Sequence, residues 1–241
     1  MKRSNREIMD WVLNNLGRVS PHTRALDVAS GTGIFARTLA PICTWVDTFI
    51  RSHPRSREVV ALDATEAMLI EAKSKAEEEH LSNIKFTQGN AAALPFPDSS
   101  FGLVVSRLAV HHFTEPMLIL DEMARVTSPG GQVVLVDLVA SEDEEQVDFE
   151  PLNPEFFDQE ESHNRLERLR DPSHTRALSI PHISSLLSQT GLSLQDKVSI
   201  HCLRYNSYVR SRWQRFLLTW TLKNGLNQPA QIKKAGKRLD K

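Results

Sequence analysis

A short apolar run, a glycine turn and a second apolar pattern follow one another between residues 25 and 36. This order predicts a strand, a tight loop and the start of a helix. Gly31 and Gly33 permit φ angles that a side chain forbids, and they let the backbone come close to a ligand. The first turn of the expected helix would offer free N–H groups beside the loop. The segment therefore predicts a ligand-binding loop at the end of a strand.

Two kinds of nucleotide cofactor fit such a loop. Gly31, Gly33 and Ala36 match the G-x-G-x-x-A spacing of dinucleotide-binding folds, which keeps an NAD(P)-dependent oxidoreductase open as an alternative. Asp27 argues against that ligand, because its carboxylate would meet the pyrophosphate with like charge. A ligand that carries an ammonium and a sulfonium group, such as S-adenosylmethionine, would tolerate this carboxylate.

Three further blocks follow the glycine loop in a fixed order. They are Val60 to Leu69, Gly89-Asn90-Ala91 with Leu94-Pro95-Phe96, and Arg125-Val126 with Pro129-Gly130-Gly131. With Leu26 to Gly33, this set resembles the class I S-adenosylmethionine-dependent methyltransferases, in the small-molecule branch that includes ubiquinone and menaquinone C-methyltransferases. The resemblance covers roughly residues 20–192. It implies methyl transfer to a carbon, oxygen or nitrogen of a small or medium organic substrate, such as a quinone precursor or a secondary metabolite.

Strand-like and helix-like segments alternate along most of the chain. The expected strands are residues 24–28, 58–63, 84–88, 103–106, 133–139 and 194–203, and the expected helices include 5–17, 33–43, 117–126 and 181–190. This alternation predicts an α/β fold with a doubly wound, mainly parallel sheet. We expect a methyltransferase domain over residues 1–203, with a substrate lid or insert at 140–180.

The expected insert and the C-terminal tail differ in charge. Residues 142–161 hold ten acidic residues and no Lys or Arg, which fits either a solvated loop or a mobile lid over the substrate. Residues 204–241 hold ten Lys or Arg and one acid. The family closes its sheet with an antiparallel strand, but residues 205–222 suggest an aromatic, basic helix. The C-terminal end is therefore expected to be atypical.

The resemblance implies a set of cofactor contacts. Asp27 and the two glycines would hold the methionyl part, Asp63 the ribose hydroxyls, and Asn90-Ala91 the adenine. A helix cap at Asp63 and a core position for Met68 are the alternatives. The full expected set is Asp27, Ala29, Ser30, Gly31, Gly33, Asp63, Ala64, Met68, Asn90, Ala91 and Arg107.

Two positions depart from the family pattern. Asn90 and Gly102 stand where the family commonly has Asp. The carbonyl of Asn90 can still accept a hydrogen bond from an adenine amino group. These departures, with the unusual C-terminus, keep open a third reading, a protein that binds S-adenosylmethionine with weak or absent catalysis.

Three histidines are candidates for a general base. His111 and His112 follow the fourth expected strand and His174 lies in the insert; imidazole titrates near neutral pH. Core or hydrogen-bonding roles fit each of them equally well. The Asn/Asp-Pro-Pro-aromatic box of nucleic-acid amino methylases does not follow the fourth strand, and no cluster of metal ligands is evident near these segments.

Composition limits the remaining classes of function. The net charge of −1 gives no basic field for nucleic acid, so a small-molecule substrate is expected. Two cysteines far apart argue against a disulfide framework and favour a reducing, cytoplasmic setting. No apolar run is long enough for a membrane span, and the N-terminus does not resemble a signal peptide. Nothing in the sequence indicates an oligomeric state.

Overall fold

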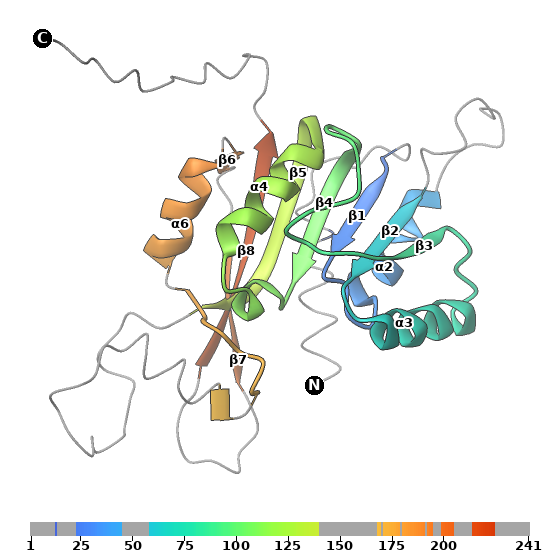
Figure 1. The fold of residues 1–241 in the computed structure, drawn as a ribbon, viewed down its shortest axis with the longest axis horizontal. Coiled ribbons are helices and arrows are strands. Elements are labelled where there is room, and N and C mark those ends of the chain that lie inside the picture. Colours follow the sequence, from blue (N-terminus) through green and yellow to red (C-terminus); the bar gives the residue numbers. More distant parts are fainter. Residues whose placement is uncertain are drawn as a thin grey trace, which may run out of the picture.

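A single twisted sheet organises the computed structural model (Figure 1). The structure describes residues 13, 23–44, 58–139, 168–169, 171–178, 180–190, 192–194, 199–204 and 214–224. The strands are β1 (Ala25–Val28), β2 (Val59–Asp63), β3 (Ile84–Gln88), β4 (Phe101–Arg107), β5 (Thr127–Val139), β6 (Leu192–Leu194), β7 (Ser199–Arg204) and β8 (Gln214–Asn224). Their order is β3-β2-β1-β4-β5-β8-β6, and β7 also pairs with β8.

Five neighbouring strands, β3-β2-β1-β4-β5, are parallel. Nearly every residue of β1, β2 and β4 is buried, as expected for strands that are covered on both faces. Parallel pairing brings all five carboxyl ends to one edge of the sheet. The predicted strands at 24–28, 58–63, 84–88, 103–106 and 133–139 are confirmed, and β4 and β5 begin earlier than predicted.

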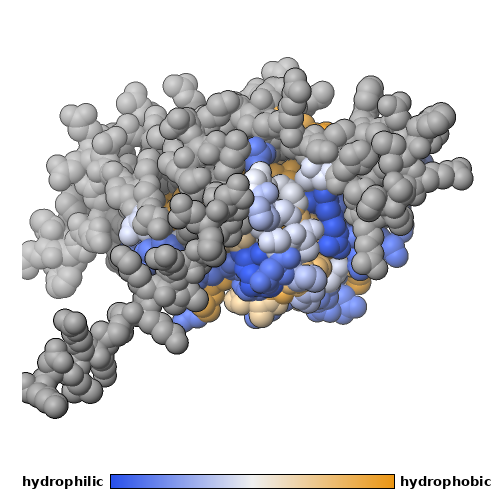
Figure 2. Space-filling model, turned by 90° about the horizontal axis from the view of Figure 1, so that it is seen from above, coloured by the Kyte–Doolittle hydropathy of each residue, from blue (hydrophilic) through white to orange (hydrophobic). Residues whose placement is uncertain are grey.

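Helices cover both faces of the sheet. They are α2 (Ile34–Leu39), α3 (Glu66–Glu78), α4 (Pro116–Val126) and α6 (Ile180–Gln189), with short 3-10 turns η1 (Ile42–Thr44) and η2 (Val110–His112). α4 and α6 pack residues such as Met123 and Leu187 against Leu26 and Val104. α2 packs Phe35 against Val105 on the opposite face. The expected doubly wound α/β class is confirmed. On the face seen in Figure 2, hydrophilic residues cover much of the described surface.

The C-terminal end differs from the prediction. Residues 214–224 form β8, which runs antiparallel to β5 with Val133 opposite Leu222 and Val139 opposite Phe216. The predicted helix over 205–222 is therefore wrong for its described part, and the closing antiparallel strand is present. The predicted strand at 194–203 corresponds to the separate strands β6 and β7. The sheet thus extends past residue 203.

Several predictions concern residues outside the described part. Of the helix expected at 5–17, the structure describes only Leu13, which is helical. The connection at 45–57 and the acidic segment 142–161 also lie outside the described residues. Within the ranges that are described, no helix is both long and apolar enough to cross a membrane.

Candidate active site

The carboxyl edge of the sheet contains its topological switch point. β1 lies between β2 and β4, so the chain turns to opposite sides after β1 and after β4, and such a crevice is where open α/β sheets bind ligands. Two non-glycine residues at this edge have a left-handed backbone conformation: φ is 54° at Ala29 and 51° at Leu108, directly after β1 and β4. This conformation is strained for non-glycine residues, and such strained residues cluster at functional sites.

The two glycines of the loop after β1 serve different purposes. Both have left-handed φ, 52° at Gly31 and 71° at Gly33. A Cβ built on Gly33 would lie 3.0 Å from the Cβ of Ala72 in α3, so Gly33 allows close packing of the helix. A Cβ on Gly31 would meet nothing within 4 Å. Gly31 therefore leaves open space beside the loop, where a ligand can approach the backbone.

Matched alanine substitutions separate these roles. Gly31→Ala should destabilise the fold by about 1–2 kcal/mol, the cost of a left-handed L-residue. Gly33→Ala adds a steric contact with Ala72, so its free energy of unfolding should fall by a further ~1–3 kcal/mol. Urea unfolding of both variants measures the difference. Equal losses would contradict the assignment of Gly33 to helix packing.

Asp63, the last residue of β2, connects the loop to the second strand. Its Oδ2 accepts a hydrogen bond from Gly31 N–H at 2.8 Å, and its Oδ1 accepts one from Thr65 N–H at 2.9 Å. The side chain lies at a partly exposed position. A carboxylate has about four lone-pair sites, so two backbone bonds leave capacity for two ligand hydroxyls.

Asp27 is buried behind the loop and links β1 to the first turn of α2. It is 1% exposed, and its Oδ2 accepts a hydrogen bond from Ala36 N–H, in the first turn of α2, at 2.9 Å. Burial raises the pKa of Asp27 to about 7, against the opposing effects of the Ala36 N–H and of Arg107. Burial also lowers the pKa of Arg107, while Asp27 and Asp137 raise it. The structure thus places Arg107 as a charge neighbour of Asp27.

The other predicted cofactor residues surround this loop at different depths. Ser30 N–H donates to Leu62 O, and its buried Oγ has no hydrogen-bond partner among the described residues. Ala64 and Met68 are exposed, Met68 by 42%. Asn90 is exposed, and its Oδ1 accepts Ala92 N–H at 2.9 Å. The side chain of Ala91 is buried in the core.

Arg125 and Glu122 of α4 anchor the segment that follows Asn90. Nε and Nη2 of Arg125 donate to the two oxygens of Glu122 at 2.6 and 2.8 Å. The same guanidinium donates to Leu94 O, Phe96 O and Asp98 Oδ1. Glu122 in turn accepts Leu94 N–H. Sequence reasoning used Arg125 as a family marker and missed this role.

The structure brings the three predicted histidines together. The ring centroid of His111 lies 4.1 Å from that of His112 and 5.3 Å from that of His174. Residues 171–178 pack onto η2, because the carbonyl of His111 accepts Thr175 N–H at 2.9 Å and Thr175 Oγ1 at 2.8 Å. His112 Nδ1 donates to Ser173 O at 3.0 Å, and His174 Nε2 accepts Ala177 N–H at 3.3 Å.

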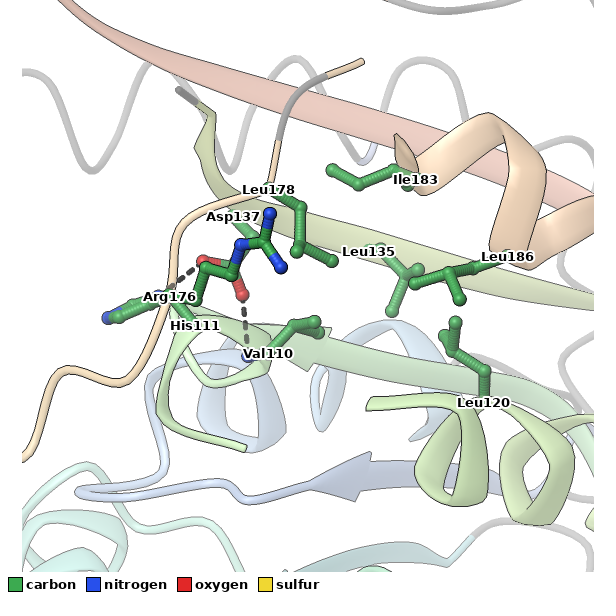
Figure 3. A pocket seen from close by; sticks show the side chains of 9 residues that line it. All are labelled: Val110, His111, Leu120, Leu135, Asp137, Arg176, Leu178, Ile183 and Leu186. Carbon is green, nitrogen blue, oxygen red and sulfur yellow. Dashed lines mark hydrogen bonds and ion pairs between the residues drawn. The ribbon is translucent and has the colours of Figure 1, made fainter. Parts of the chain in front are cut away.

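Asp137 of β5 is the residue of this cluster that sequence reasoning missed. It is buried and binds His111 Nδ1 through its Oδ1, while its Oδ2 accepts the N–H groups of Ala109 and Val110 (Figure 3). The same carboxylate lines a small pocket whose other walls include Leu135, Leu178 and Ile183. The available signal was a charged residue within an otherwise apolar run, Val133 to Val139.

Gly102 has a packing explanation. A Cβ at this position would lie 2.9 Å from Cγ2 of Thr23, so a larger residue would require the Thr23 side chain to shift. Gly102 is the second residue of β4, at the end opposite the ligand edge. Its departure from the family pattern therefore does not alter the candidate site.

No group of three or more metal-ligating side chains occurs within the described ranges.

The parallel sheet and the glycine loop at its switch point define a Rossmann-like fold of class I methyltransferases. Residues 26–135 match the family described as "Methyltransferase domain". The chain is 34% identical over 188 residues, 78% of its length and 64% of the relative's, to the uncharacterized methyltransferase YcgJ of Bacillus subtilis (strain 168). The crystal structure of YcgJ gives a TM-score of 0.66 at 25% identity, covering 92% of this chain and 97% of that one.

A second curated relative carries a more specific name. The chain is 32% identical over 136 residues to a demethylmenaquinone methyltransferase of Geobacillus sp. (strain WCH70), covering 56% of this chain and 54% of the relative. The chain thus spans between about half and two thirds of the length of these curated relatives.

Proposed function

We propose that the chain transfers a methyl group from S-adenosylmethionine to a small or medium organic molecule. The observation that carries this proposal is the bond between Asp63 and Gly31 N–H at the switch point. It joins a carboxylate with spare lone pairs to a loop with open space, inside a matched methyltransferase domain. These two features fit a ligand that has a diol and a compact polar end.

Different residues at the carboxyl edge of the sheet would bind different parts of the cofactor. Asp63 would accept both ribose hydroxyls, and Gly31 with Ser30 would face the methionyl part. The unpartnered Oγ of Ser30 is a buried hydroxyl that a polar ligand group would satisfy. Asn90 would meet the adenine, held in place by the loop that Arg125 anchors. Ala29, Ala64, Met68, Asp27 and Arg107 complete the proposed set.

Methyl transfer from a sulfonium is an in-line displacement, so the protein must align the reacting atoms and exclude water. Orientation alone can lower such a barrier by about 7–11 kcal/mol. We propose that residues 140–180 select the substrate, because residues 171–178 of this segment are bonded to η2 at the same edge. The name of the demethylmenaquinone relative makes quinone-type acceptors the first class to screen.

Calorimetric titration with S-adenosylhomocysteine, with NAD as the control ligand, tests the cofactor assignment. We expect micromolar binding of S-adenosylhomocysteine and no heat from NAD, because residues 26–135 match a family described as "Methyltransferase domain". Binding of NAD alone would favour the oxidoreductase alternative. Tight binding of S-adenosylhomocysteine without turnover on a broad acceptor panel would favour a binding protein.

A further inference from the structure

His174 accepts a hydrogen bond that helps to hold segment 171–178 in its packed position. The residue is only 3% exposed, and its Nε2 accepts the N–H of Ala177 at 3.3 Å. A backbone N–H can only donate, so this bond requires a lone pair on Nε2. The imidazole of His174 is therefore neutral while the bond exists.

The neighbouring His112 is bonded to the same segment in the opposite sense. Its Nδ1 donates to the carbonyl oxygen of Ser173 at 3.0 Å, and the residue is partly exposed. An imidazolium also carries a proton on Nδ1, so this bond persists when His112 is protonated. Of these two histidines, only His174 makes a bond that depends on the neutral form of the ring.

The surroundings of His174 do not compensate an added positive charge. A proton on Nε2 would face the N–H of Ala177, so two donors would meet where a hydrogen bond now exists. The ring centroid of His111 lies 5.3 Å away, and Asp137 is already bonded to that ring (Figure 3). Three guanidinium groups outnumber the two carboxylates nearby, and burial makes an uncompensated charge costly. The charged and titratable groups of the surrounding elements are His111 and His112 of η2, Asp137 of β5, Arg107 of β4, His182 of α6, and Arg168, Asp171 and Arg176.

We infer that His174 is a pH-sensitive latch, which keeps segment 171–178 packed on η2 when neutral and releases it when protonated. The inference goes beyond the proposed function and does not depend on it. The released segment binds a proton on His174 more readily than the packed segment, so packing weakens as pH falls through the range in which imidazole titrates, about pH 8 to 5. The bonds from Thr175 to the carbonyl of His111 should be lost at the same time. For the proposed methyl transfer, release would open the carboxyl edge in mild acid.

Two carboxyl groups also make stability depend on pH, but in ways that can be separated from the latch. Hydrogen bonds from Ser173 lower the pKa of Asp171 below its usual value of 3.8, so Asp171 stays ionised between pH 5 and 8. Burial raises the pKa of Asp27, which stabilises the whole fold as pH falls. A loss of packing that is confined to segment 171–178 in this pH range therefore has neither carboxyl group as its cause.

Hydrogen exchange of the full chain, measured by mass spectrometry of a peptic peptide that spans residues 171–178, tests the latch. Protection is corrected for the intrinsic exchange rate at each pH. In the wild type, we expect protection of this peptide to fall by about tenfold or more from pH 8 to pH 5, because a lost hydrogen bond and a new repulsive contact act together. Peptides from β1 and β4 should keep or gain protection, since the segment opens without unfolding of the sheet.

Variants of the two neighbouring histidines form a matched pair. His174→Gln offers a carbonyl oxygen to the N–H of Ala177 but does not titrate, so protection of the segment should no longer depend on pH. His112→Asn offers an amide donor to the carbonyl of Ser173, and it leaves His174 in place. The fall in protection between pH 8 and pH 5 should therefore remain in His112→Asn.

Three results would overturn the inference. They are wild-type protection of the segment that is the same at both pH values, a fall of wild-type size that persists in His174→Gln, and a fall that disappears in His112→Asn. An equal loss in the β1 and β4 peptides would also overturn it, because the whole domain would then respond to pH. Low protection of the segment at both pH values in His174→Gln supports the latch, since this variant then resembles the released state.

Discussion

Asp63→Ala should weaken S-adenosylhomocysteine binding by more than tenfold. The substitution removes a charged acceptor for two ribose hydroxyls, and a hydrogen bond to a charged group contributes about 1.5–3 kcal/mol. It also removes the partner of Gly31 N–H, which helps to fix the loop beside the ligand. Calorimetric titration of both proteins measures the change directly.

Glu58 offers a matched control for this experiment. It directly precedes β2, whereas Asp63 ends it, and its carboxylate is paired with Arg24 rather than with the loop. Glu58→Ala should leave the affinity within about twofold, because a part-exposed ion pair at the far end contributes mainly to stability. An unchanged affinity in Asp63→Ala, or an equal loss in both variants, would refute the ribose assignment.

Asp27→Asn should change how the stability of the fold depends on pH. The pKa of Asp27 is raised from 3.8 to about 7, with burial as the main cause. Between these values the folded state keeps the proton and the unfolded state releases it. The wild-type free energy of unfolding therefore falls as pH rises from about 4 to 7, by up to ~4 kcal/mol from this group. Asparagine does not titrate and can still accept Ala36 N–H, so the variant should lose this slope.

Urea unfolding of wild type and variant between pH 4 and 8 tests this prediction. The stability of Asp27→Asn relative to wild type should increase with pH. In this variant Arg107 still has Asp137 as a charged neighbour. The contribution of Asp171 to stability depends on pH with the opposite sign. Hydrogen bonds from Ser173 lower its pKa, so Asp171 contributes stability that is lost as pH falls. A relative stability of Asp27→Asn that is independent of pH would contradict the raised pKa.

Local pattern was sufficient for the parallel half of the fold. Strands buried on both faces have continuous apolar runs, such as Val59 to Leu62, and glycine turns mark their ends. The same reasoning located the ligand edge and placed Asp63 and Gly31 there. It could not assign separate roles to Gly31 and Gly33, because the closeness of Ala72 is a property of packing and not of the loop sequence.

The sequence-based predictions were wrong or incomplete where a segment fits both the helical and the strand period, or where the contact joins residues far apart in the chain. Trp213, Phe216 and Trp220 suggested a helical spacing, but Phe216, Leu218, Trp220 and Leu222 also recur at every second residue. Pairing with β5 selects the strand. Asp137 and His111 are 26 positions apart, so their bond cannot be read from local sequence. The family resemblance likewise marked Arg125 without showing the carbonyl groups that it holds.

β8 is paired on both sides, with β5 on one and with β6 and β7 on the other. A chain cut after Arg204 would lack β8 and would leave the backbone N–H and C=O groups of Gln132 to Val139 unpaired along that side. An unprotected edge of this kind recruits strands from other molecules. The last strand therefore protects the domain against self-association, and shortened forms that retain the entire ligand edge should still aggregate.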